Sequence, residues 1–216
     1  MNFFSIILVD IFLMKIKWLI PVVFVLLMWV VFIVQLVLNL DVSSLGIYPK
    51  DSTTLLGIFT SPLIHGSWNH LISNTLPVLI LGMLLFVMYE KMALTVWILN
   101  YILTGLLVWL FARSSYHIGA SGIVYGLASF LLFSGFFRMD IKAIAVASGV
   151  AIFYGGMVWG ILPLKEGISW ESHLFGGIVG FGLAFLFKNN SKDSQIEQHE
   201  NEKNTRKVFD EYLKNK

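Results

Sequence analysis

The sequence contains no cysteine and few charged residues. None of its 216 residues is Cys, and Asp, Glu, Lys and Arg together make up only 13%. The lack of cysteine excludes disulfides and thiolate chemistry. Soluble domains carry about 25% charged residues, whereas this chain is 57% hydrophobic, with a mean hydropathy of +0.79. The composition therefore predicts an integral membrane protein.

The sequence also lacks the common motifs that bind cofactors and metals. It has no GxGxxG, no P-loop and no HExxH pattern. The formal net charge of +2 carries little information, because the distribution of charge between segments matters more in a membrane. We expect no cofactor, no resident metal and no nucleic-acid partner, and the lipid bilayer as the surroundings of the chain.

The long apolar runs predict an all-α polytopic membrane protein, a bundle of six transmembrane helices. A spanning helix needs roughly 20 apolar residues. The segments that reach or approach this length are Trp18–Leu40, Trp68–Met88, Met92–Ala112, Ser121–Phe137, Ile141–Leu162 and Trp170–Phe187. The fourth and sixth are short, which indicates that their ends lie below the membrane surface. Residues 41–67 are interrupted by Pro and Gly, so we expect them to lie at the interface or to dip into the protein.

These runs divide the chain into three parts. Residues 1–17 are expected to form a cytoplasmic or interfacial segment, 18–187 the six-helix domain, and 188–216 a polar cytoplasmic tail with a short helix near Val208–Leu213. Glu90-Lys91 is expected to form a tight turn between the second and third helices. Lys and Arg are more frequent at the ends of helices that face inward when the N-terminus is inside. Both termini are therefore predicted to be cytoplasmic, in a membrane that we expect to be a bacterial plasma membrane.

A few polar residues interrupt the apolar segments, and such residues are functional candidates in a membrane. They are His65, His70, Asn74, Ser121 and His173. His70 and Asn74 begin the second helix, Ser121 the fourth and His173 the sixth. With an inner N-terminus, these three helix starts all lie at the outer face. The sequence thus predicts one polar site near the outer leaflet.

Small residues offer a way to bring two of these helices together. Gly122 and Gly126 lie four apart on the fourth helix, and Gly176 and Gly180 follow His173 on its face of the sixth. Small residues at this spacing let helices approach closely. Ser121 and His173 would then come within hydrogen-bond range, and a histidine base activates a serine nucleophile.

The surroundings of this pair indicate acyl-transfer chemistry by a dyad. No carboxylate within the spans is placed to orient the histidine, since Glu171 is two residues from His173 and points elsewhere on a helix. Tyr125, one turn after Ser121, is a candidate to stack on the imidazole. His70, the Asn74 amide and the Ser121 backbone N–H are candidate donors for a developing oxyanion.

Three motifs on these helices resemble the rhomboid intramembrane serine proteases. They are "HGSWNHLISN" with His65, His70 and Asn74, "GASGIVYG" with Gly119, Ser121, Gly122 and Tyr125, and "SHLFGGIVG" with His173, Gly176 and Gly180. The resemblance covers most of the chain, from Leu45 to Phe187. Ser172 stands where alanine is frequent in the family, and the Trp-Arg pair that some members carry between the first two helices is missing.

The resemblance implies a six-helix core whose site is reached through a water-filled cavity. Ser121 would be the nucleophile and His173 the base, with an acyl-enzyme intermediate. His70 and Asn74 would line the oxyanion site, Tyr125 would pack on His173, and His65 would support the cavity. Substrates would be transmembrane proteins cut near the outer leaflet. Independently of the resemblance, we expect the loop Pro163–Ser169 and the upper part of the fifth helix to form a lateral gate for substrates.

Three other interpretations stay open at this stage. Ser121 alone would be read as a helix cap, and its two glycine neighbours as the residues of a tight turn. The three histidines would suit a metal transporter or sensor. A rhomboid-like binding protein without catalysis is the third alternative, although the chain keeps both Ser121 and His173.

Overall fold

A computed structural model describes residues 18–164 and 167–189. Within these ranges the regular structure is helical, apart from an isolated bridge between Ile47 and His117. The predictions for residues 1–17 and for the tail beyond residue 189 lie outside the described residues.

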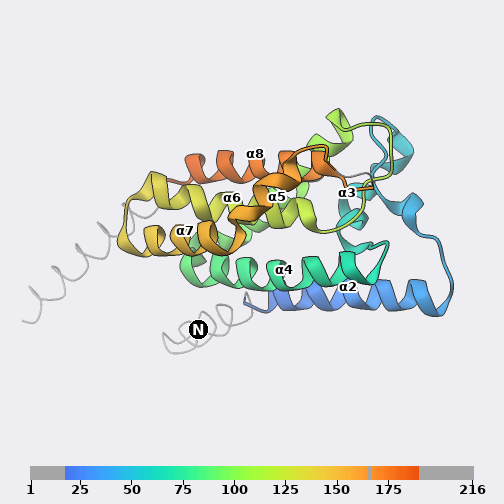
Figure 1. The fold of residues 1–216 in the computed structure, drawn as a ribbon, viewed down its shortest axis with the longest axis horizontal. Coiled ribbons are helices and arrows are strands. Elements are labelled where there is room, and N and C mark those ends of the chain that lie inside the picture. The colour runs from blue at the N-terminus through green and yellow to red at the C-terminus, as the bar shows by residue number, and fades with distance from the viewer. Residues whose placement is uncertain (1–17, 165–166, 190–216) are drawn as a thin grey trace, which may run out of the picture.

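The helices follow the predicted order along the chain (Figure 1). The α-helices are α2 (Leu19–Val37), α3 (Gly57–Thr60), α4 (Trp68–Met88), α5 (Glu90–Phe111), α6 (Ser121–Arg138), α7 (Ile141–Tyr154) and α8 (Trp170–Leu186). The 3₁₀ helices are η1 (Ser43–Leu45), η2 (Ser52–Thr54), η3 (Ser61–Leu63) and η4 (Gly155–Ile161).

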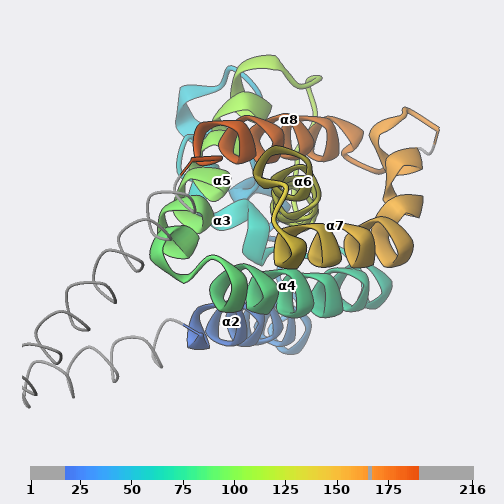
Figure 2. The same cartoon turned by 90° about the vertical axis from the view of Figure 1, so that its left-hand side faces the viewer.

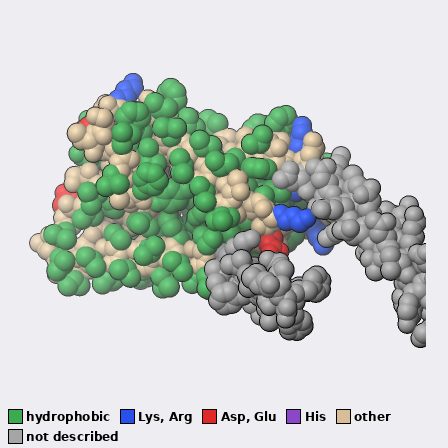
Figure 3. Space-filling model, turned by 180° about the vertical axis from the view of Figure 1, so that it is seen from behind, with side chains coloured by type: hydrophobic (Ala, Val, Ile, Leu, Met, Phe, Trp, Pro, Cys, Tyr) green, Lys and Arg blue, Asp and Glu red, His purple; other side chains and the backbone are tan. Residues whose placement is uncertain are grey.

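The lengths and surfaces of these helices are those of a polytopic membrane protein. Among the described residues, five segments are long and apolar enough to cross a bilayer: α2, α4, α5, α6 and α7 with η4. α8 has 17 residues, so it extends about 26 Å at about 1.5 Å per residue, and it completes the bundle. On the face shown in Figure 3, hydrophobic side chains cover most of the length of the molecule, and the charged ones lie toward its ends.

Two predicted boundaries need correction. The fifth segment was expected to be one helix over Ile141–Leu162, but its α-helix ends at Tyr154 and continues as η4. Gly155 and Gly156 at this junction have low α-helix propensity, so the α-helix ends here. The chain continues as a 3₁₀ helix, which rises further per residue than an α-helix. The predicted turn at Glu90-Lys91 is at Tyr89 instead, because Glu90 already begins α5.

α6 is the central helix of the bundle (Figure 2). It packs most extensively against α8, and also against α7, α4 and α5. α2 lies on the outside, against α4. The segment 41–67 does not span the bundle, as expected: it folds into four short helices at the end where α4, α6 and α8 begin (Figure 1).

Glycines on α8 allow the close contact with α6. A Cβ atom at Gly176 would collide with the backbone carbonyl of Gly122, and one at Gly180 with the carbonyl of Gly126. The α6 glycines themselves make room mainly for α5: a Cβ at Gly126 would collide with the Asn100 amide, and one at Gly122 would lie 2.9 Å from a methyl group of Thr104. The two glycine pairs therefore serve two different helix contacts.

The α5 residues that fill this space bind the α6 backbone. Asn100 is buried, and its Nδ2 donates to the Ile123 carbonyl at 3.0 Å. Thr104 Oγ1 in turn donates to Asn100 Oδ1 at 3.2 Å. A neutral amide can thus be buried here because its polar atoms are hydrogen-bonded.

His65 lies in the loop that leads into α4 and is fully buried. Its Nδ1 lies 3.3 Å from the Leu63 carbonyl, and its ring meets that of His70 edge to face, with 4.9 Å between centroids. Burial, and to a smaller extent the neighbouring His70, lowers the pKa of His65 from 6.5 to about 4. His65 is therefore neutral at physiological pH.

Gly180→Ala is expected to destabilise the protein. The new methyl group would meet the Gly126 backbone and lie 2.9 Å from the Phe130 nitrogen, and backbone atoms cannot move aside as a side chain can. Overpacking of this kind costs about 1–3 kcal/mol. Gly182→Ala on the same helix is the matched control, since a Cβ there has nothing within 4 Å. Thermal unfolding in detergent should show a loss for Gly180→Ala only, and equal behaviour of the two variants would contradict the packing argument.

The low pKa of His65 predicts that acid destabilises the fold. Between pH 4 and 6.5 the unfolded chain binds a proton that folded His65 does not. The contribution is fully present above the unfolded pKa and is lost as the pH falls toward 4, by about 2 kcal/mol between about pH 7.5 and 5. Unfolding of wild type and His65→Gln across this range measures it. The variant should show the smaller change, and identical pH profiles would refute the assignment.

Candidate active site

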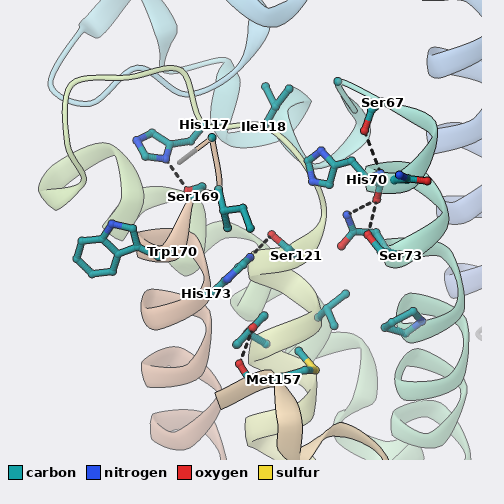
Figure 4. Close-up of a pocket in the computed structure, with 18 of the residues that line it drawn as sticks. Ser67, His70, Ser73, His117, Ile118, Ser121, Met157, Ser169, Trp170 and His173 are labelled. Atoms are coloured by element: carbon teal, nitrogen blue, oxygen red, sulfur yellow. Dashed lines mark hydrogen bonds between the residues drawn. The ribbon is translucent and has the colours of Figure 1, made fainter. Parts of the chain in front are cut away.

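Ser121 and His173 are in direct contact at the start of two helices. Ser121 is the first residue of α6, and His173 lies in the first turn of α8. His173 Nε2 is 2.8 Å from Ser121 Oγ. Figure 4 shows the two side chains pointing toward one another across the α6–α8 contact. The glycine contacts further down these helices hold their backbones close enough for this distance.

A backbone carbonyl orients the histidine. His173 Nδ1 lies 2.7 Å from the Gly160 carbonyl in η4. A carbonyl oxygen only accepts hydrogen bonds, so the proton of the neutral imidazole is on Nδ1 and Nε2 has a free lone pair. Nε2 therefore accepts from the Ser121 hydroxyl, as a general base must.

Tyr125 holds the plane of the imidazole. Its ring stacks on His173 with centroids 4.2 Å apart and planes 4° apart. Its hydroxyl donates to the Met157 carbonyl at 2.7 Å. A Cβ atom at Gly160 would collide with the Tyr125 hydroxyl, so only glycine fits where the backbone approaches both rings.

Ser121 does not cap α6. The N-cap position is Ala120, and no side chain there forms a capping hydrogen bond. The cap interpretation is therefore wrong for this serine. The turn that precedes it depends on Gly119, which has φ +101°, a conformation that glycine adopts with little strain.

A cavity of about 1200 Å³ opens beside the pair. His70, Asn74, Ser121, Tyr125 and His173 all line it. Thus the structure brings the predicted polar residues to one cavity, except His65. Figure 4 shows His70 across the cavity from Ser121. The packing glycines lie along the α6–α8 and α5–α6 contacts below it.

The α4 residues present donors to this cavity. Ser67 caps α4 by accepting from the His70 N–H at 3.2 Å. The Asn74 Nδ2 donates to the His70 carbonyl at 2.9 Å, which uses one of its two hydrogens and leaves the other. A Cβ at Gly119 would collide with His70 Nε2, so this nitrogen lies beside the turn that leads to Ser121.

Several groups at this end of the bundle were missed by the sequence argument. The role of a backbone carbonyl, such as that of Gly160, cannot be recognised from the type of residue that carries it. His117 is 2% exposed, but its place in a connection hid its burial. Glu171, in contrast, was considered: it is buried and binds Arg113 at 3.3 Å rather than the histidine, as its two-residue offset from His173 predicted.

A family model and several known proteins are similar to this chain. A family model described as a rhomboid domain matches residues 52–190. An uncharacterized protein of Mycobacterium bovis is 35% identical over 157 residues, which cover 68% of this chain and 65% of that protein. An uncharacterized protein of Mycobacterium leprae is 33% identical over 188 residues, 80% of this chain and 73% of its own length. A protein of Acanthamoeba polyphaga mimivirus, provisionally named a rhomboid protein, is 28% identical over 177 residues, 78% of this chain and 97% of its own.

The chain thus spans 65% of the length of the Mycobacterium bovis relative. The match to the family model covers more than half of the chain, and it includes the starts of α4, α6 and α8. The chain belongs to the rhomboid family.

Proposed function

We propose that the protein is an intramembrane serine endopeptidase that uses Ser121 as nucleophile and His173 as general base. The chain belongs to the rhomboid family, whose members are generally serine proteases that act within the membrane. The observation that carries the proposal for this chain is the pair of hydrogen bonds to His173. One nitrogen is 2.7 Å from the Gly160 carbonyl and the other 2.8 Å from Ser121 Oγ.

The proposed reaction uses these positions. Ser121 Oγ attacks the scissile carbonyl carbon while its proton passes to His173 Nε2. The tetrahedral intermediate collapses, His173 gives the proton to the departing amine, and an ester to Ser121 remains. Water then attacks the ester with His173 again as base, which releases the acid and restores the hydroxyl.

His70, Asn74 and the Ser121 backbone N–H are proposed to stabilise the oxyanion. The first two line the cavity from α4, and Figure 4 shows His70 across the cavity from Ser121. Tyr125 is proposed to keep the imidazole in plane, and His65 to support His70 through their edge-to-face contact.

The substrates are proposed to be transmembrane proteins. Ser121 lies at the start of a spanning helix, in a cavity that the end of α7 and the residues before α8 also line. The span formed by α7 and η4 is little covered by the rest of the protein, with 11% of it buried, so we propose that substrates enter beside it. In this proposal both termini are cytoplasmic, and the cavity faces the outer leaflet of a bacterial plasma membrane.

The metal alternative finds no support in the described residues. Nowhere in 18–164 or 167–189 do three or more His, Cys, Asp or Glu side chains gather in a way that could hold a metal ion. The direct Ser121–His173 contact favours catalysis over a purely binding role.

Ser121→Ala and His173→Ala are expected to abolish cleavage of a model transmembrane substrate, with a loss on the order of 10⁶-fold. Labelling by a fluorophosphonate probe should disappear in Ser121→Ala. Ser129→Ala is the control on the same helix, since that hydroxyl binds the Gly177 carbonyl instead. Activity should survive a strong chelator. Cleavage by both dyad variants, or loss on chelation that zinc restores, would exclude the proposal.

His70→Ala and Asn74→Ala are each expected to slow acylation by about 10²–10³-fold, the usual loss for one oxyanion donor. Binding of an uncleaved transmembrane peptide should change little. Thr75→Val is the control, because Thr75 faces α2 and accepts from Trp29 at 3.0 Å. Acylation rates equal to wild type in both variants would remove these residues from the oxyanion site.

A further inference from the structure

A second histidine–serine contact lies beside the proposed dyad. His117, in the loop between α5 and α6, is buried, and its Nδ1 is 2.6 Å from Ser169 Oγ. Ser169 is the N-cap residue of α8. Figure 4 shows this bond next to the pair formed by Ser121 and His173. It therefore joins the residues just before α6 to the residue just before α8.

The direction of the bonds follows from the partners. His117 Nε2 lies 3.0 Å from the Arg113 carbonyl, which only accepts, so this nitrogen carries the proton and Nδ1 accepts from Ser169. Ser169 Oγ is also 2.6 Å from Ser172 Oγ. Because the Ser169 proton is directed at His117, Ser172 donates to Ser169. Burial lowers the pKa of His117, which favours the neutral ring that this chain of bonds requires.

An ion pair makes a parallel connection between the same two segments. The Arg113 guanidinium donates to the Ile168 carbonyl at 2.8 Å and lies 3.3 Å from Glu171 Oε1. Glu171 is buried whereas the Arg113 side chain is exposed, so water weakens this pair less than it would a pair with both side chains at the surface.

The α5–α6 loop, which carries His117, is itself held in place by other segments. The His117 N–H donates to the Ile47 carbonyl at 2.8 Å, and the Ile47 N–H donates to the His117 carbonyl at 3.0 Å. The Gly119 N–H donates to the Ser61 carbonyl at 2.8 Å. The α5–α6 loop is thus fixed to the segment between α2 and α4, and it offers a firm anchor for the start of α8.

We propose that His117 is a positioning residue that, through Ser169 and Ser172, sets the placement of His173 relative to Ser121. This inference rests on the proposed function. Ser121 follows His117 by four residues and His173 follows Ser172 directly, so a connection between these segments acts on both members of the dyad. A misplacement of about 1 Å costs about 10²-fold in rate.

The experiment compares variants of the full chain in liposomes. His117→Phe keeps a ring but removes both hydrogen bonds, His117→Asn keeps an acceptor for Ser169, and Ser169→Ala removes the hydroxyl. Ser129→Ala is the matched control, since it removes an α6–α8 hydrogen bond of 2.7 Å away from the start of α8. The first readout is the rate of fluorophosphonate labelling of Ser121 as a function of probe concentration. The second is hydrogen exchange of residues 169–173.

We expect His117→Phe and Ser169→Ala each to lower the maximal labelling rate by about 10- to 100-fold without changing the half-saturating probe concentration. The double variant should lose little more than either single one, because both act through one chain of bonds. His117→Asn should recover most of the rate. Exchange at residues 169–173 should rise in His117→Phe and stay unchanged in Ser129→Ala.

The inference would be overturned if His117→Phe and Ser169→Ala both showed the labelling rate and hydrogen exchange of the wild type. It would also be overturned if Ser129→Ala lost as much labelling rate as these two variants. If His117→Phe fails to fold, Ser169→Ala and His117→Asn decide the question. If wild type itself shows no labelling that depends on Ser121, the proposed function fails, whereas hydrogen exchange still shows whether His117 holds the start of α8.

Discussion

The close contact between α6 and α8 is the constraint on which the site depends. The hydroxyl of Ser121 and the imidazole of His173 meet at 2.8 Å only because two helix backbones run side by side below them. Gly176 and Gly180 lie against the carbonyls of Gly122 and Gly126, where any Cβ atom would collide with backbone. In a bilayer, apolar burial does little to drive helices together, so this close packing has to supply much of the association.

Contacts at the end of the bundle fix the starts of α6 and α8, which the glycine packing further along these helices does not fix alone. Helices that touch along their length can still shift or tilt at their ends, and both members of the proposed dyad lie at helix starts. The segment between α2 and α4 holds the α5–α6 loop, and that loop holds the first turn of α8 through Ser169 and Glu171. The segment 41–67 therefore contributes to the geometry of the site without lining its centre.

Most of the fold and the residues of the candidate site were predictable from the sequence. Spanning helices are long apolar runs, and the start of α4 at Trp68 and of α6 at Ser121 matched the prediction. Polar side chains in such runs are rare enough to stand out. The hydrogen-bond partners of these side chains were harder to predict. Gly160 acts through its backbone carbonyl, and in the sequence it is only a glycine in an apolar segment. His117 lies in a polar loop, where a buried histidine looks like any exposed one.

The partner of His173 also explains how the proposed dyad could work without a carboxylate. Placing an ion in a low-dielectric interior is costly unless it is paired, and a carboxylate beside a neutral imidazole would be unpaired in the resting state. The Gly160 carbonyl fixes the same tautomer with a neutral dipole. Tyr125 then supplies the restraint on ring rotation that a second carboxylate oxygen would otherwise help to give. A neutral carbonyl stabilises an imidazolium less than a carboxylate would, so in the proposed reaction this partner offsets less of the charge that develops on His173.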